Sequence, residues 1–238
     1  MSTDGLSRRT FMQAAGAALI AVQPSPHRRR RRPRTISWSG RSWIVRPARW
    51  RGLPGPNMWS ARNVAVEGGI LRLAINRSSR GWTCAEIQSR RSFGYGRYEF
   101  VVNSDLSRLD PWVVLGLFTY DGQIPSPHNE IDIEVAKWGH LRDRADAQFV
   151  VQRAGTHGDA KPIKLPPRPP YTMWWEWTQG NIAWGITDGT GAFVSTRSKP
   201  TSFEPAGEHV HLNLWLAEGH APAEPLTIEI GGFRHTPV

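Results

Sequence analysis

The sequence predicts an all-β fold, a two-sheet antiparallel β-sandwich of the jelly-roll type. Short segments of alternating or continuous apolar residues recur from residue 35 onward, and Gly, Pro, Asn and Asp separate them. No stretch shows a convincing helical period. Such a series of strands is typical of sandwiches and jelly rolls. The length of 238 residues fits one such domain, residues 35–238, with an N-terminal tail.

The tail, residues 1–34, is predicted to be an export signal followed by a linker. Ser7-Arg8-Arg9-Thr10-Phe11-Met12-Gln13 has the pattern of a twin-arginine signal, and the apolar run 14–22 is too short to span a membrane. We therefore expect export by the twin-arginine route to the cell envelope or the exterior, with transient membrane contact. Because a clean A-x-A cleavage site is missing, trimming near Ala21 and retention as a membrane tether both stay open.

The positive charge of the chain is concentrated in this tail. Residues 1–34 hold eight arginines and one acid, a net charge of +7 out of a total of +10. We interpret the basic run 28–34 as a solvated Arg/Pro-rich linker rather than as a contact for anionic lipid or cell-wall polymer. The remainder is close to charge balance, which argues against a nucleic-acid-binding protein.

The strands are expected in a regular order. Residues 64–66 and 70–75 flank Glu67-Gly68-Gly69 as a hairpin, and 84–89 and 97–102 flank a glycine-containing turn. The apolar run 113–120 is long enough for a central strand. About twelve strands are completed by 130–135, 147–152, the hairpin 172–177 and 182–186, 193–196, 210–216 and 226–233. The prolines between 162 and 170 exclude a central strand there.

Two side-chain counts bear on the core and on ligands. A single cysteine, Cys84, excludes an intrachain disulfide, so the domain must be stable without one. Twelve tryptophans are an unusual number for one domain. Buried tryptophan is an ordinary core residue, but we expect some of these rings to be exposed platforms for the apolar faces of sugars.

The chemistry is concentrated in Asn129-Glu130-Ile131-Asp132-Ile133-Glu134-Val135. Because a strand has a period of two, Glu130, Asp132 and Glu134 share one face and the apolar residues share the other. An isolated strand of this pattern is more often a solvated face. Here no Lys or Arg lies between the acids, so repulsion and partial burial would move their pKa values apart. One protonated and one ionised carboxyl group suit glycoside hydrolysis.

The spacing imposes a geometric condition on this reading. Positions i and i+4 of a strand are about 13 Å apart along the backbone. Retaining glycosidases hold their two carboxyl groups about 5–5.5 Å apart. The pair therefore works only if strand twist and side-chain lean bring the two carboxyl ends together.

The motifs resemble glycoside hydrolase family 16, the group of lichenases, laminarinases and xyloglucan transglycosylases, which implies a concanavalin A-like jelly roll. Glu130-Ile131-Asp132-Ile133-Glu134 is similar to the unbulged catalytic strand of that family. Other motifs match in the same order over residues 82–216, namely 84–86 with 94–99, Leu117-Phe118-Thr119-Tyr120 with Gly122, 180–184 with Asp188-Gly189, and His211-Leu212-Asn213-Leu214-Trp215.

The resemblance implies a role for each matching residue. Glu130 would be the nucleophile, Glu134 the general acid and then the base, and Asp132 would hydrogen-bond between them and tune Glu130. The residues implied to line the donor subsites are Glu86, Phe118, Tyr120, Asn213 and Trp215. Trp138 is a further predicted sugar-binding residue, which the resemblance itself does not supply. For the aromatic members of this set, plain core packing is the alternative.

Several positions depart from the lichenase-like pattern. Gln88 stands where those members carry Arg, and Val150 and Gln152 stand where they carry Asn and Tyr. Lys137-Trp138-Gly139 replaces the usual turn of small residues. Because these positions would contact sugar, mixed-linkage glucan is not assigned as the substrate.

The main hypothesis is a retaining endo-β-glycanase that works as a monomer. A non-catalytic carbohydrate-binding sandwich and a transglycosylase are the alternatives. We expect no cofactor, and a metal at the three acids is disfavoured because side chains on a strand fan out. A structural calcium elsewhere is left open.

Overall fold

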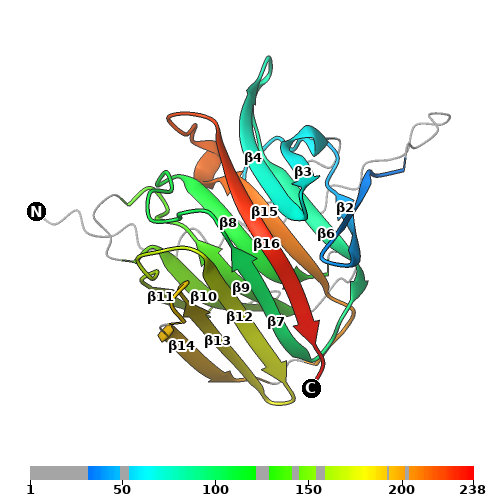
Figure 1. Ribbon diagram of the computed structural model, residues 1–238, viewed down its shortest axis with the longest axis vertical. Helices are drawn as coiled ribbons and strands as arrows, with labels where there is room; N and C mark the ends of the chain where they lie inside the picture. Colours follow the sequence, from blue (N-terminus) through cyan, green and yellow to red (C-terminus); the bar gives the residue numbers. More distant parts are fainter. Residues whose placement is uncertain are drawn as a thin grey trace, which may run out of the picture.

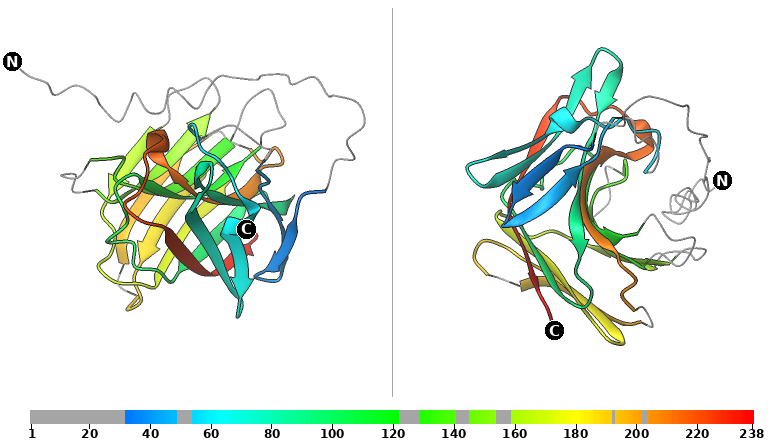
Figure 2. Two further views of the ribbon diagram at one scale, coloured as in Figure 1. Left: turned by 90° about the horizontal axis from the view of Figure 1, so that it is seen from above. Right: turned by 90° about the vertical axis from the view of Figure 1, so that its right-hand side faces the viewer.

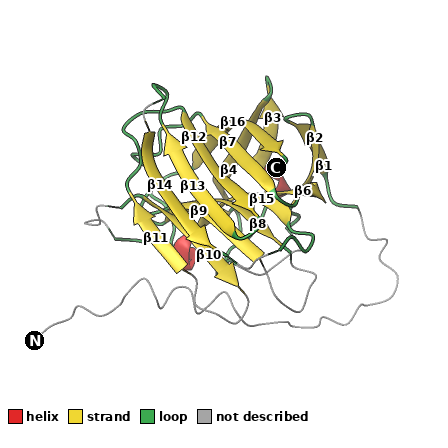
Figure 3. Ribbon diagram, turned by 90° about the horizontal axis from the view of Figure 1, so that it is seen from below, coloured by secondary structure: helices red, strands yellow, loops and turns green. Residues whose placement is uncertain are grey.

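The computed structural model describes residues 32–48, 54–121, 129–140, 145–153, 159–191, 193–201 and 204–238, and they form two antiparallel sheets (Figure 1). Further views show the sheets as two layers, with almost no helix (Figures 2 and 3). The expected export signal and all but the end of the linker lie outside the described residues, as does Gly122. Within the described part of the chain, neither helical turn has the length and apolar character needed to cross a membrane.

The first sheet carries the predicted catalytic strand near its middle. Its order is β1 (Thr35–Trp38), β2 (Arg41–Val45), β6 (Ala85–Ser92), β15 (His209–Leu216), β8 (Val113–Tyr120), β9 (Asn129–Val135), β10 (Ala147–Arg153) and β11 (Asp159–Ile163). Strand β9 is paired on both sides, which holds its backbone in one register.

The second sheet packs against the first. Its order is β14 (Phe193–Pro200), β13 (Asn181–Thr187), β12 (Tyr171–Thr178), β7 (Gly96–Val102), β16 (Leu226–Thr236), β4 (Ile70–Ser78) and β3 (Val64–Glu67), and β5 (Gly81–Thr83) pairs with β4. Two short 3-10 turns complete the elements, η2 (Ala61–Asn63) and η3 (Ala217–Gly219).

The predicted sandwich is confirmed, and the differences lie in short elements and pairings. The hairpins β3–β4 and β12–β13 form as expected. The segments 84–89 and 97–102 are not partners, because β6 belongs to the first sheet and β7 to the second. The strands β1, β2, β5 and β11 were not predicted, since each has only three to five residues. Strand β11 contains Pro162 and lies at the sheet edge, where proline is tolerated.

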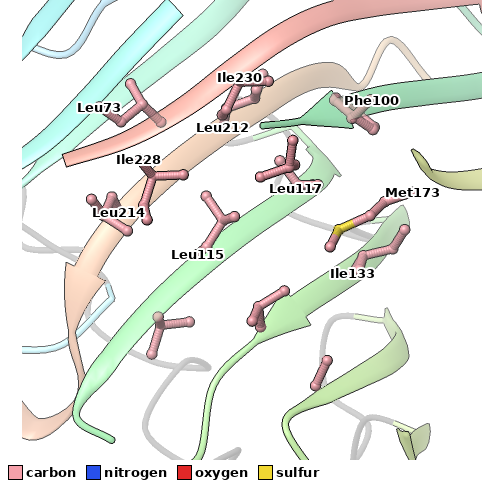
Figure 4. Close-up of a cluster of buried hydrophobic side chains, with 14 of the residues drawn as sticks. Leu73, Phe100, Leu115, Leu117, Ile133, Met173, Leu212, Leu214, Ile228 and Ile230 are labelled. Atoms are coloured by element: carbon pink, nitrogen blue, oxygen red, sulfur yellow. The ribbon is translucent and has the colours of Figure 1, made fainter. Parts of the chain in front are cut away.

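The core lies between the two sheets. Ile131, Ile133 and Val135 of β9 are almost completely buried, as the period-two pattern requires. They belong to one hydrophobic cluster with inward side chains of other strands, and Figure 4 shows Ile133 in it together with Leu117, Leu212, Met173 and Phe100. Most tryptophans are core residues rather than exposed platforms, with seven of them buried: Trp38, Trp43, Trp59, Trp175, Trp177, Trp184 and Trp215.

Candidate active site

All three predicted catalytic carboxylates lie on the outer face of the first sheet, the face turned away from the core. Antiparallel pairing arranges the side chains of this face in rows that cross the strands. From β10 to β6, one row is Gln148, Glu134, Gly116, Asn213 and Glu86, and the next is Val150, Asp132, Phe118, His211 and Gln88. In a third row, Gln152 pairs with Glu130 and Tyr120 with His209. These pairings bring five of the six predicted sugar-binding residues into or next to the rows of the carboxylates.

The three carboxyl groups interact with one another and with two glutamines of β10. Asp132 is buried and shares a side-chain hydrogen bond with Glu130. Gln152 Nε2 donates to Asp132 Oδ2 over 3.3 Å, and Gln148 Nε2 donates to Glu134 Oε2 over 2.6 Å. Each acid therefore has a fixed hydrogen-bond partner, which limits its orientation.

Burial separates these acids from ordinary surface carboxylates. Burial raises the pKa of Glu134 to about 7, against the lowering effect of the Gln148 hydrogen bond. The pKa of Glu130 is also raised, to about 8, by burial and by the charge of Glu134, while the hydrogen bond from Asp132 opposes this. Burial and the charges of both glutamates raise the pKa of Asp132 well above its usual range. Since Asp132 is the most buried and has two acidic neighbours, it is the group that retains the proton shared with Glu130.

This arrangement suits a division of labour. A protonated Asp132 donates to Glu130 and so favours the ionised form of Glu130, against burial and the Glu134 charge, which raise its pKa. Glu134, held by a neutral amide, keeps its proton up to about neutral pH. One ionised and one protonated carboxyl group on the same strand are the two groups that stepwise glycoside hydrolysis uses.

Asn213 lies level with Glu134, across Gly116. A Cβ atom at Gly116 would collide with Asn213 Oδ1, so the glycine makes room for the amide on this face. Asn213 is buried, and its Oδ1 finds no hydrogen-bond partner among the described residues. A buried acceptor without a partner is costly, and it is a natural position for a ligand hydroxyl.

Glu86 is the centre of a charged network that the sequence did not predict. Its Oε2 accepts from Arg46 Nη1 over 2.6 Å, and its Oε1 lies 3.1 Å from His211 Nδ1. Burial alone would raise the pKa of Glu86, but the His211 hydrogen bond and the Arg46 charge outweigh it and hold the pKa below its usual value. The Arg46 guanidinium stacks 4.0 Å above the Trp59 ring. An arginine thus does lie beside Glu86, although Gln88 occupies the expected position.

The aromatic residues of the site fall into two groups. Phe118 stacks on the His211 ring with centroids 5.0 Å apart, and Tyr120 meets the same ring edge-on at 6.0 Å. The charge of Glu130 contributes to raising the pKa of Tyr120, after burial, which places this hydroxyl near the nucleophile candidate. Beyond Asn213 on β15, Trp215 meets Trp138 edge-on at 5.8 Å. Trp215 is only 5% exposed, so it serves the core as well as this face.

Four residues of the site were missed in the sequence: Arg46, Gln148, His211 as a partner of Glu86, and Gly116. None carries a local signal, because each acts through a strand neighbour that is distant in the chain. Only Gln148 could have been identified from the sequence. Antiparallel pairing of the predicted strands 130–135 and 147–152 would have placed it opposite Glu134. Within the described ranges, no group of three or more His, Cys, Asp or Glu side chains could hold a metal ion.

The sandwich and the paired carboxylates define a glycoside hydrolase. Residues 56–230 match the model of glycosyl hydrolases family 16, and the chain belongs to this family. It is 28% identical over 191 residues to a β-glucanase of Paenibacillus macerans, covering 75% of this chain and 76% of the relative. It is 40% identical over 82 residues to the endo-1,3-1,4-β-glycanase ExoK of Rhizobium meliloti, but that match spans only 29% of the relative.

The solved structures agree with this assignment at the level of the fold. The β-glucanase of Bacillus licheniformis superimposes with a TM-score of 0.66 at 24% identity, covering 82% of this chain and 92% of that chain. The structure of a pseudo β-1,3-glucanase of Mycobacterium tuberculosis also superimposes with a TM-score of 0.66, at 17% identity. It covers 82% of this chain and 91% of that chain.

Proposed function

We propose that this chain is an exported, retaining endo-β-glycanase that cleaves a β-glucan through a covalent intermediate on Glu130. The observation that carries the proposal is the hydrogen-bonded carboxyl set of β9, in which Asp132 is paired with Glu130 and burial raises the pKa of Glu134 to about 7. Glu130 and Glu134 point to the same side of one strand, and both are held by their neighbours.

The proposed reaction has two steps. The Glu130 carboxylate attacks the anomeric carbon, the bond from that carbon to the leaving-group oxygen breaks, and Glu134 gives its proton to this oxygen. Glu134, now ionised, then removes a proton from water. The water oxygen bonds to the anomeric carbon, and the Glu130 carboxylate leaves. Asp132 acts as a positioning residue, because its proton stabilises Glu130 when Glu130 is the leaving carboxylate.

The substrate class rests on the relatives, which carry the names β-glucanase and endo-1,3-1,4-β-glycanase. The face that would receive the sugar chain differs from the lichenase-like pattern at Gln88, Val150 and Gln152. Val150 is apolar, so it offers no hydrogen bond beside Asp132, and it is fully buried, so the expectation that it contacts sugar is wrong. We therefore propose a β-glucan whose linkage pattern differs from that preferred by lichenases.

Product analysis by mass spectrometry tests this function. The full chain and its Glu130→Gln variant are incubated with barley β-glucan, laminarin, lichenan and xyloglucan. We expect defined oligosaccharides from the unchanged chain alone, and their masses and linkages identify the polymer. The same products from both proteins would contradict the role of Glu130, and no product from any glucan would contradict the proposed activity.

Export is supported by the twin-arginine motif at Arg8 and Arg9. Fusion of residues 1–34 to a reporter that is active only after export tests it, with the change of both arginines to lysine as the control. Export of the lysine variant at the same level would contradict the twin-arginine route. We also propose a monomer, which size-exclusion chromatography with light scattering checks.

A non-catalytic glucan-binding protein is the second candidate. The substituted positions Gln88, Val150 and Gln152 favour it, as does the structural likeness to a protein titled a pseudo β-1,3-glucanase. Saturable glucan binding without any product after prolonged incubation would support this candidate. A transglycosylase uses the same covalent intermediate, and longer products on addition of short acceptor sugars would reveal it.

A further inference from the structure

Three loops meet at the end of β9 that lies beyond Glu134. The loop after β9 contains Trp138 and Gly139, and Gly139 N donates to Pro111 O over 2.8 Å, in the loop before β8. Ala217 N, after β15, donates to Trp112 O over 2.7 Å. We call the side chains of Trp112, Trp138, Trp215 and His220 the aromatic rim. Backbone hydrogen bonds thus join the three chain segments that carry the residues of the aromatic rim.

The backbone of the rim is held in an uncommon conformation. Among the described residues, three non-glycine residues have positive φ, and two of them, Trp138 (φ 53°) and Glu218 (φ 52°), belong to these loops. A bulky side chain at positive φ is disfavoured, and such residues gather at functional positions. The strain in the Trp138 turn must be offset by the contacts around it.

Those contacts fix the turn firmly. Gly139 has φ 77°, and its Cα lies against the Trp112 ring so closely that any side chain would collide with it. The His220 ring also contacts Trp112 and stacks on it with centroids 3.8 Å apart and planes 20° apart. His140 N also closes the turn on Lys137 O over 2.8 Å. The fold therefore holds Trp138 in place although its own backbone is disfavoured.

The position of Trp138 relative to Glu134 suggests what this conformation provides. Trp215 follows Asn213 by two residues on the outer face, and Asn213 is level with Glu134. Trp138 meets Trp215 edge-on at 5.8 Å and is only partly buried. Trp138 thus follows Glu134 by four residues, in the loop after β9, and its ring packs on Trp215 with part of its surface exposed.

The chemistry then indicates which sugar lies there. In the proposed reaction, Glu134 protonates the leaving-group oxygen, so the sugar that carries this oxygen must lie next to Glu134. The C–H groups of a β-glucosyl ring present an apolar face that packs on an indole ring. We propose that Trp138 is the stacking platform for the leaving-group sugar, and for an acceptor sugar in the second step. This inference rests on the proposed function and adds to it a specificity-determining residue.

In the acceptor reaction the atoms balance as in hydrolysis. The acceptor hydroxyl gives its proton to Glu134, its oxygen bonds to the anomeric carbon, and the bond to Glu130 breaks. A sugar held by Trp138 therefore speeds this step, whereas the reaction with water does not depend on the ring.

Reactivation of a trapped intermediate tests the inference. The full chain is treated with the 2,4-dinitrophenyl 2-deoxy-2-fluoro glycoside of a β-glucan trisaccharide, which accumulates the glycosyl-enzyme on Glu130 and is followed by mass spectrometry. The trapped protein is freed of reagent, and recovery of activity is timed with and without added cellobiose or laminaribiose. The variants are Trp138→Ala, Trp138→Phe and, as a matched control, Trp174→Ala, since Trp174 lies on the other sheet under Arg97.

We expect the disaccharide to accelerate reactivation in the unchanged chain and in Trp174→Ala. In Trp138→Ala this acceleration, taken relative to reactivation by water in the same variant, should fall roughly tenfold, and Trp138→Phe should restore most of it. An equal acceleration in Trp138→Ala would overturn the inference while the trapped intermediate upholds the proposed function. Failure to label Glu130 at all would overturn both. An equal loss with water and with disaccharide would also overturn it, because that pattern indicates a structural role.

Discussion

At the scale of single residues, the acids of β9 differ from surface carboxylates because the fold buries them together. Protonation of Glu134 stabilises the folded chain, since burial raises its pKa from the unfolded value of 4.5 to about 7. A group with a raised folded pKa contributes its full stability below the unfolded pKa, and that contribution is lost as the pH rises through the folded pKa. The site that performs the proposed chemistry therefore opposes stability at neutral and alkaline pH.

Glu134→Gln should consequently increase stability at high pH. The amide cannot ionise, and it retains an oxygen that can accept from Gln148. At pH 8 we expect a gain on the order of 1–2 kcal/mol in the free energy of unfolding, shrinking toward zero near pH 4.5. Urea denaturation at both pH values measures it, and activity should fall at least 100-fold. A gain of the same size at both pH values would contradict the assignment to this ionisation.

Gly116 is a second residue at which a single added atom, a Cβ, should change the site. A Cβ atom there collides with Asn213 Oδ1, so Gly116→Ala should displace the amide from its place beside Glu134. We expect kcat/KM on the glucan to fall roughly 10- to 100-fold, with a smaller effect on the thermal midpoint. Gly232→Ala is the control, because Gly232 faces open space. Equal activity of the two variants would show that Asn213 has no part in the site.

At the scale of elements, each strand of the first sheet contributes a different part of the site. Strand β9 provides the acids, β10 the amides that hold them, and β8 and β15 the aromatic and amide side chains alongside. The register decides which of these side chains meet, and a shift of one residue would turn a strand's outer residues into the core. Strand β9 has five strands on one side and two on the other, and pairing with β8 and β10 keeps its register firm.

Glu86 of β6 joins three parts of the first sheet, because it is held by Arg46, directly after β2, and by His211 of β15. Arg46→Met should leave the Glu86 carboxylate buried with His211 as its remaining named partner. We expect a loss of about 2–4 kcal/mol in the free energy of unfolding at pH 7, which chemical denaturation measures. Because the folded pKa of Glu86 is lowered, the loss should diminish as the pH falls through that value. Adding Glu86→Gln to Arg46→Met should recover part of the stability. No recovery would contradict a buried unpaired charge as the cause of the loss.

At the scale of the whole molecule, the two sheets are joined by packing and by a polar link at one edge. Arg197 of β14 donates to the carbonyl oxygens of Phe149 and Asp159, over 3.2 and 3.1 Å, and its Nη2 lies 2.6 Å from Asp159 Oδ1. Phe149 stacks on Trp184 of the opposite sheet at 6.1 Å. The edge that ends with β11 is thus held to the second sheet through β14.

Arg197→Ala should loosen this edge without dismantling the site. We expect a loss of about 1–3 kcal/mol in unfolding free energy and faster amide hydrogen exchange confined to β10, β11 and β14. Arg234→Ala is the control, since Arg234 is a mostly exposed partner of Glu99. Faster exchange spread over both whole sheets would contradict a local role for Arg197.

The scale at which a feature arises explains how much of it could be predicted. Alternation along β9 is local, so the common face of Glu130, Asp132 and Glu134 and the burial of Ile131 and Ile133 follow from the strand alone. The number of strands was underestimated, because strands of three to five residues have too little pattern. The tryptophan count predicted that some rings would be exposed, but it could not say which of them fill the core, since a count carries no information on burial.

The sequence by itself determined the all-β class, the position of the acidic strand β9 and the face on which its acids lie. These three features depend on a period of two residues, which can be recognised within any short segment. Only the tertiary structure decided that Arg46 and His211 hold Glu86, that Gln148 holds Glu134, and that Trp138 stands against Trp215. The physical reason is that strand pairing joins residues far apart in the chain, 125 positions for His211 and Glu86, and no local pattern records which strands become neighbours.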